Sequence, residues 1–146
     1  MMPNPATMTG DKKDLPEVEQ MGVMALEALH AFDCTNPDRR MLSIFGVIYD
    51  VTSSEKGYGS DGAYKEFAGH DITLAIATSK TGYDWLDKFC KMEEKWTTDA
   101  KRWADYFESK YPVCGKLDKW ENEDPETWEP LTEEEKEALS KSCCIM

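Results

Sequence analysis

The chain has 146 residues, of which 17 are lysine or arginine and 29 are aspartate or glutamate, so its formal net charge is −12. This length is typical of one domain with extensions at its ends. The negative charge argues against a nucleic-acid partner, because phosphate binding depends on clustered lysine and arginine. Hydrophobic residues make up 40% of the chain, enough for one core, and no apolar run is long enough to span a bilayer.

The first 20 residues contain three prolines and few apolar side chains, which predicts a flexible tail. They lack the apolar stretch of a secretory signal, so we expect a cytoplasmic protein. The cysteine count is odd and no C-x-x-C pair occurs, which argues against a disulfide framework or a cysteine zinc site. The five cysteines are Cys34, Cys90, Cys114, Cys143 and Cys144.

Residues 24–32 place apolar side chains at steps of three and four and predict a short helix. Residues 41–52, MLSIFGVIYDVT, are rich in β-branched and aromatic side chains on both sides of Phe45 and Gly46. They predict two short strands joined by a tight turn, in which Gly46 can adopt a positive φ.

Residues 53–62, SSEKGYGSDG, are expected to form a glycine-rich loop. Helical patterning resumes in residues 63–69 and 72–78, with Asp71 as a candidate cap of the second helix.

The longest periodic segment, residues 92–111, predicts an amphipathic helix that Pro112 ends. Its apolar stripe, including Trp96 and Trp103, indicates core packing rather than a cofactor box. The stripe consists of Met92, Trp96, Ala100, Trp103, Phe107 and Tyr111.

Residues 118–142 carry ten acidic and three basic side chains, a local net charge of −7, and predict a solvated tail. Within them, Thr132 and Glu135 have the spacing of a capping box, which predicts a short helix near residues 133–141 with little apolar surface for docking.

The loop sequence from Gly57 to Gly62 matches G-x-G-x-x-G, with Asp84 some twenty residues further on. A dinucleotide site is disfavoured, because that motif requires a full-length helix and then a parallel strand. Two interpretations remain open. The glycines can simply let the loop turn back, or they can let the backbone, Tyr58 and Tyr64 approach a flat ligand.

The segment of residues 45–71, FGVIYDVTSSEKGYGSDGAYKEFAGHD, resembles the signature of the membrane-associated progesterone receptor (MAPR) family. The similarity continues downstream and covers about residues 24–117. The downstream matches are Trp103, Phe107, Lys110, Tyr111 and residues 115–117.

The resemblance implies an α+β domain of the cytochrome b5-like fold, a small sheet whose helices form a haem cleft, at residues 21–117. Residues 1–20 and 118–146 are then a flexible tail and an acidic tail. By position, Tyr64 is the implied axial ligand of haem b and Tyr58 its hydrogen-bond partner, while Lys110 and Tyr111 line the opposite side.

Cytochrome b5 proper uses two histidines, whereas here none lies between Ala31 and Gly69, which disfavours electron transfer by bis-histidine haem. His70 stands where the MAPR family usually has arginine. We consider three roles for it: an exposed loop residue, a haem ligand beside or instead of Tyr64, and a partner of a haem propionate.

The function implied by the resemblance is non-catalytic: haem binding by tyrosinate ligation, as a haem carrier or as an adaptor for haem enzymes such as cytochromes P450. The alternative is a haem-free interaction module of the same fold. The sequence does not decide whether a steroid binds or whether haem stacking forms a dimer.

The C-terminal residues Cys143-Cys144-Ile145-Met146 fit a C-a-a-X box, which predicts farnesylation of Cys143. A single lipid chain binds membranes weakly, and the acidic residues upstream are repelled by anionic lipids. We therefore expect weak, peripheral attachment to the cytosolic face of endomembranes.

Overall fold

The computed structural model describes residues 17–79 and 85–141, and its sheet has four strands in the order β1-β4-β3-β2. Strands β2, β3 and β4 pair antiparallel, while β1 runs parallel to β4. The strands are β1 (Gly22–Met24), β2 (Met41–Ile44), β3 (Val47–Asp50) and β4 (Val113–Leu117). Strand β1 was not anticipated, because the strand that it pairs with, β4, lies some ninety residues further along the sequence.

Strands β2 and β3 form the predicted hairpin. Phe45 and Gly46 both have positive φ, 53° and 80°, the conformation of a two-residue turn between twisted strands. Gly46 also faces Trp120, whose Cβ would lie only 2.4 Å from a Cβ added at this glycine. Position 46 therefore needs glycine for both its backbone angle and its space.

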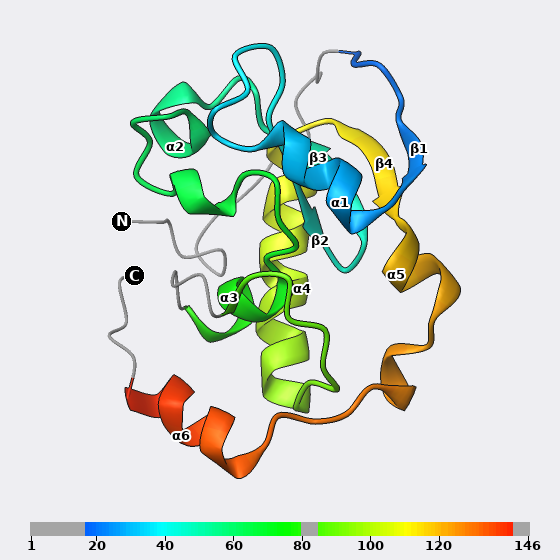
Figure 1. Cartoon of the computed structure of the whole chain (residues 1–146), viewed down its shortest axis with the longest axis vertical. Coiled ribbons are helices and arrows are strands. Elements are labelled where there is room, and N and C mark those ends of the chain that lie inside the picture. Colours follow the sequence, from blue (N-terminus) through cyan, green and yellow to red (C-terminus); the bar gives the residue numbers. More distant parts are fainter. Residues whose placement is uncertain (1–16, 80–84, 142–146) are drawn as a thin grey trace.

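Helices surround this sheet, and Figure 1 shows the longest, α4, running along the long axis of the molecule with α3 against it. The apolar stripe of α4 packs into the core as predicted, with Trp103 buried and Trp96 half-buried. The helix ends at Lys110, just before Tyr111 and Pro112.

The α-helices are α1 (Leu26–Leu29), α2 (Glu55–Tyr58), α3 (Thr73–Thr78), α4 (Glu94–Lys110), α5 (Asp118–Asn122) and α6 (Glu133–Lys141). The 3₁₀ turns are η2 (His30–Phe32), η3 (Lys65–Phe67) and η5 (Pro125–Thr127).

Two of the short predicted helices are present, one of them split in two, and a third is only a 3₁₀ turn. The helix expected over residues 24–32 is α1 followed by η2, and the one over residues 72–78 is α3. Asp71 lies two residues before the start of α3, and its Oδ1 accepts the Thr73 N–H at 3.1 Å. The expected loop contains the single turn α2, and residues 63–69 contain only the turn η3.

The acidic C-terminal segment is not simply a solvated tail. Helix α6 has the predicted bounds, and its capping box is formed on both sides: Thr132 N–H donates to Glu135 Oε1 at 3.0 Å, and Glu135 N–H donates to Thr132 Oγ1 at 3.1 Å. However, Leu131 and Leu139 are buried in the same core cluster as α3 and α4. Two leucines are too few to give a periodic pattern, yet they suffice to dock the helix.

Two expectations fall on residues that the structure does not describe, namely most of the N-terminal tail and the prenylation site Cys143. Within residues 17–79 and 85–141, no helix combines the length and the apolar character needed to cross a membrane.

Candidate functional site

Four tyrosines and one lysine from the α2 loop and the C-terminal end of α4 form one group, in which the ring centroids of Tyr58 and Tyr111 lie 6.2 Å apart. We call this group the tyrosine cluster: Tyr58, Tyr64, Tyr106, Lys110 and Tyr111. It contains four of the five cofactor-binding residues predicted from the sequence, all but His70.

The glycine-rich loop holds Tyr58 and Tyr64 close together. Gly57 O accepts the Tyr64 N–H at 2.8 Å, so the two ends of the loop are tied to each other. A Cβ at Gly62 would lie 2.4 Å from Gly57 O, so this closure requires glycine there. The glycines thus let the loop turn back, and in doing so they place Tyr58 and Tyr64 in the same cluster.

Tyr58 is the buried member of the cluster, with 5% of its surface exposed. Its ring centroid lies 6.4 Å from that of Phe107 and 6.2 Å from that of Tyr111. Burial raises the pKa of the Tyr58 hydroxyl well above its ordinary value, and the phenols of Tyr111, Tyr106 and Tyr64 raise it further. Tyr58 therefore stays protonated and can act as a hydrogen-bond donor.

Tyr64 is more accessible than Tyr58. Its side chain is half-buried, and its ring stacks on Phe67 with centroids 6.1 Å apart and planes inclined by 23°. Desolvation raises the pKa of its hydroxyl. Because a free phenol is neutral near pH 7, a Tyr64 phenolate needs a strong Lewis acid to form.

Lys110 brings a positive charge to the phenols. Its Nζ donates to Tyr106 Oη at 2.9 Å and lies 5.7 Å from the centroid of the Tyr111 ring. The hydrogen bond with Tyr106 raises the pKa of Lys110 above its ordinary value, so the ammonium stays charged. Tyr106 was missed in the sequence, although it lies one helical turn before Lys110, a spacing that puts both on one face of α4.

The cluster can hold a hard cation and an anionic group together. A partly exposed phenol is a ligand for ferric iron, a buried phenol can donate a hydrogen bond to it, and the ammonium can pair with a carboxylate. These residue types suit an iron porphyrin, which has a metal at its centre and carboxylates at its edge.

His70 lies in a different cluster. Its Nδ1 is 2.7 Å from Asp87 Oδ2, and its ring centroid is 5.0 Å from that of His30. Of the three roles considered for His70, the exposed loop residue is wrong, because its side chain is only 23% exposed and is bound to Asp87. The two haem-related roles stay predictions.

The loop is not built like a dinucleotide site. The motif's glycines precede no full-length helix, since α2 is one turn inside the loop. The next strand among the described residues, β4, runs antiparallel to β3. Asp84 lies outside the described residues.

The sheet, its flanking helices and the tyrosine cluster define a domain of the cytochrome b5-like fold. A solved structure from Arabidopsis thaliana, described as having a cytochrome b5 like fold, matches with a TM-score of 0.62 and 27% identity, over 69% of this chain and 94% of that one. Residues 25–118 match the family "Cytochrome b5-like Heme/Steroid binding domain". The chain belongs to this family and to its MAPR branch.

Two curated relatives carry informative names. The human membrane-associated progesterone receptor component 2 is 31% identical over 97 residues, which cover 64% of this chain and 44% of that protein. The cytochrome P450 regulator dap1 of Schizosaccharomyces pombe is 30% identical over 84 residues, covering 52% of this chain and 51% of that protein. The chain spans about half the length of these curated relatives.

Proposed function

We propose that the chain is a non-catalytic haem-binding protein in which the Tyr64 phenolate is the axial ligand of haem b. The observation that carries this proposal is that Tyr58 packs against Tyr111 beside the Lys110 ammonium, while the backbone bond from Tyr64 to Gly57 holds Tyr64 at the other end of the same loop. Membership of a haem/steroid-binding family supports it.

The residues of the cluster fit this cofactor. Bound haem would supply a ferric iron, which favours an anionic oxygen ligand. Tyr64 presents a partly exposed phenol that can lose its proton to such an ion. Burial keeps the Tyr58 hydroxyl protonated, so it can donate a hydrogen bond to the Tyr64 oxygen. Lys110 can pair with a propionate at the cluster's outer side.

The proposed role is that of a haem carrier or an adaptor for other haem proteins. A relative named as a cytochrome P450 regulator makes cytochromes P450 the first partners to test. Tyrosinate ligation stabilises ferric iron, which suits holding haem better than cycling electrons. Farnesylation of Cys143 would place this activity at the cytosolic face of endomembranes. Mass spectrometry of the native C-terminus tests that modification.

The deciding experiment is a haem titration of the purified chain. Ferric haemin should bind one to one and give a high-spin tyrosinate spectrum, and Tyr64→Phe should abolish that spectrum. Tyr49→Phe is a matched control. Tyr49 hydrogen-bonds Ala104 O at 3.4 Å, outside the tyrosine cluster, so its loss should leave haem uptake unchanged.

Two results would contradict this assignment. An unchanged spectrum in Tyr64→Phe would remove Tyr64 as the ligand, and His70→Gln would then test the histidine. Absence of binding at micromolar haemin would favour the haem-free interaction module. For the adaptor role, the wild-type chain should alter the turnover of a reconstituted cytochrome P450, whereas Tyr64→Phe should not.

A further inference from the structure

We propose that His30, His70 and Asp87 form a binding site for a divalent transition metal ion, best suited to Zn²⁺. We call these three residues the histidine–aspartate cluster. It is separate from the tyrosine cluster and rests on different observations, so it does not depend on haem binding at Tyr64.

The three side chains offer converging ligand atoms. Asp87 Oδ2 lies 2.7 Å from His70 Nδ1 and 3.0 Å from His30 Nε2. One ligand atom from each residue lies within 4.8 Å of the others. Two imidazole nitrogens and one carboxylate oxygen are a ligand set that zinc uses in proteins, with a water molecule completing the tetrahedron.

The carboxylate at the centre is held in place by the backbone. Asp87 Oδ1 accepts the Asp71 N–H at 2.8 Å, and the Asp87 N–H donates to Asp71 O at 2.9 Å. Asp87 has a φ of 55°, a left-handed conformation that aspartate tolerates better than most residues. Such supporting bonds fix a metal-binding carboxylate and leave its second oxygen directed at the ion.

The two contacts between the carboxylate and the imidazoles are already close to the spacing of a metal site. Tetrahedral zinc with bonds of about 2.0–2.1 Å places neighbouring ligand atoms about 3.3 Å apart, a few tenths of an ångström more than the two contacts here. His30, whose side chain is 43% exposed, can make that shift freely. Each imidazole binds as its neutral form with the proton on the ring nitrogen away from the metal, so the bound ion and Asp87 leave a net charge of +1.

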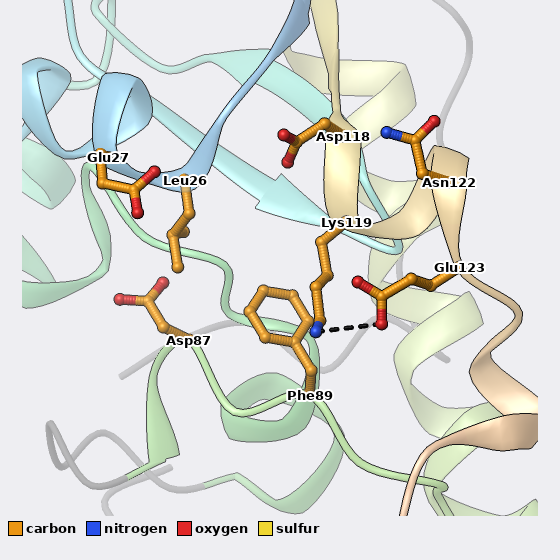
Figure 2. Close-up of a pocket in the computed structure, with 8 residues that line it drawn as sticks. All are labelled: Leu26, Glu27, Asp87, Phe89, Asp118, Lys119, Asn122 and Glu123. Atoms are coloured by element: carbon orange, nitrogen blue, oxygen red, sulfur yellow. Dashed lines mark ion pairs between the residues drawn. The ribbon is translucent and has the colours of Figure 1, made fainter.

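The surroundings favour a cation. Asp87 lines a pocket of about 440 Å³, and Figure 2 shows its carboxylate on one wall below Leu26, with Glu27 above. Asp118 and Glu123 also line this pocket. Its one lysine, Lys119, is neutralised by Glu123 at 3.1 Å. The four carboxylates that line the pocket outnumber its one ammonium, which gives the pocket a negative potential that attracts a divalent ion.

Zinc titration of the haem-free full chain tests the proposal, with Cys34, Cys143 and Cys144 changed to serine so that their thiolates do not compete. Calorimetry with Zn²⁺ should show one ion per chain with micromolar affinity. His30→Gln, His70→Gln and Asp87→Asn should each weaken binding tenfold or more. Asparagine keeps the acceptor for the Asp71 N–H and tolerates the left-handed backbone, so Asp87→Asn should remain folded.

NMR of the imidazole nitrogens provides a second readout, in which Zn²⁺ should shift His70 Nδ1 and His30 Nε2. Tyr64→Phe is the matched control and should bind zinc like wild type. Binding weaker than millimolar, or binding that the three variants leave unchanged, would overturn the proposal. A zinc effect confined to other residues would do the same.

Discussion

The tyrosine cluster takes its side chains from two stretches of sequence, the α2 loop and residues 106–111 at the C-terminal end of α4. The histidine–aspartate cluster takes one side chain from each of three separate turns. The first is anchored in the core, with Tyr58 and Tyr111 buried. The second lies at the surface and depends on backbone hydrogen bonds between residues 71 and 87.

This difference shows that one site is positioned by apolar packing and the other by hydrogen bonds. The rings of Tyr58 and Tyr111 both pack against Phe107, so core packing fixes the position of their hydroxyl groups. Imidazoles around a carboxylate are placed by directional bonds and can adjust. We therefore expect core variants to affect the first cluster and variants around Asp71 to affect the second.

Phe107→Ala should have the largest effect, because this residue is fully buried and its ring lies 5.8 Å from Tyr49 and 5.4 Å from Tyr111. We expect a loss of about 3–5 kcal/mol in the free energy of unfolding, measured in urea. Haem uptake should fall, while zinc uptake by the folded fraction should not. A loss below about 1 kcal/mol in the free energy of unfolding would show that the packing of the tyrosine cluster does not depend on this ring.

The pH dependence of stability should report the buried carboxyl of Asp71. Burial raises its pKa from 3.8 to about 6, against hydrogen bonds from Thr73, Trp120 and Ser43 that lower it. The folded chain therefore binds this proton more tightly than the unfolded chain does. The resulting stabilisation is complete below about pH 4 and is lost as the pH rises to 6, a change of roughly 3 kcal/mol.

Asp71→Asn should remove this pH dependence, measured as urea midpoints from pH 4 to 7. The exposed Asp61→Asn is the matched control and should keep it. Equal slopes in wild type and Asp71→Asn would show that Asp71 does not titrate in this range.

Trp120→Phe removes the donor that reaches Asp71 Oδ2 at 2.9 Å while keeping an aromatic ring in place. We expect a loss of about 1–2 kcal/mol at pH 7, where Asp71 is ionised, and a smaller loss at pH 4.5. Thermal unfolding at the two pH values makes the comparison. A larger loss at the lower pH would contradict a role for this hydrogen bond in stabilising the charge.

Lys110→Met should give the smallest effect, because the ammonium is exposed and its ion pair with a propionate is partly screened. We expect haem affinity to fall by a factor of about 1.4 to 5, from the 0.2–1 kcal/mol typical of such pairs. The difference should shrink as salt is added. Haem titrations in low and high salt measure it, and a salt-independent loss would indicate that the aliphatic stem matters instead.

Features set by neighbouring residues were predictable from the sequence. The hairpin followed from the β-branched and aromatic residues on both sides of Gly46, α4 from its apolar stripe, and α6 from Thr132 and Glu135. Four members of the tyrosine cluster followed from the family resemblance, since they lie in two short motifs. Their roles in haem binding remain predictions.

Features that depend on distant partners were not predictable. Strand β1 has no strong pattern of its own and exists because it pairs with β4. Leu131 and Leu139 are isolated among acidic residues, so their burial could not be read from periodicity. His30 and Asp87 carried no spacing signal, because only the folded chain brings them to His70.

The hairpin turn at Gly46 has an influence beyond the sheet. The glycine lies against Trp120, and that indole in turn covers the Asp71 carboxylate with its N–H. A methyl group at position 46 would displace the indole and admit water to a carboxylate that the native chain keeps dry. A single added carbon at position 46 would then change the proton affinity of Asp71, which lies on another segment. The displacement of Trp120 can be followed by its fluorescence.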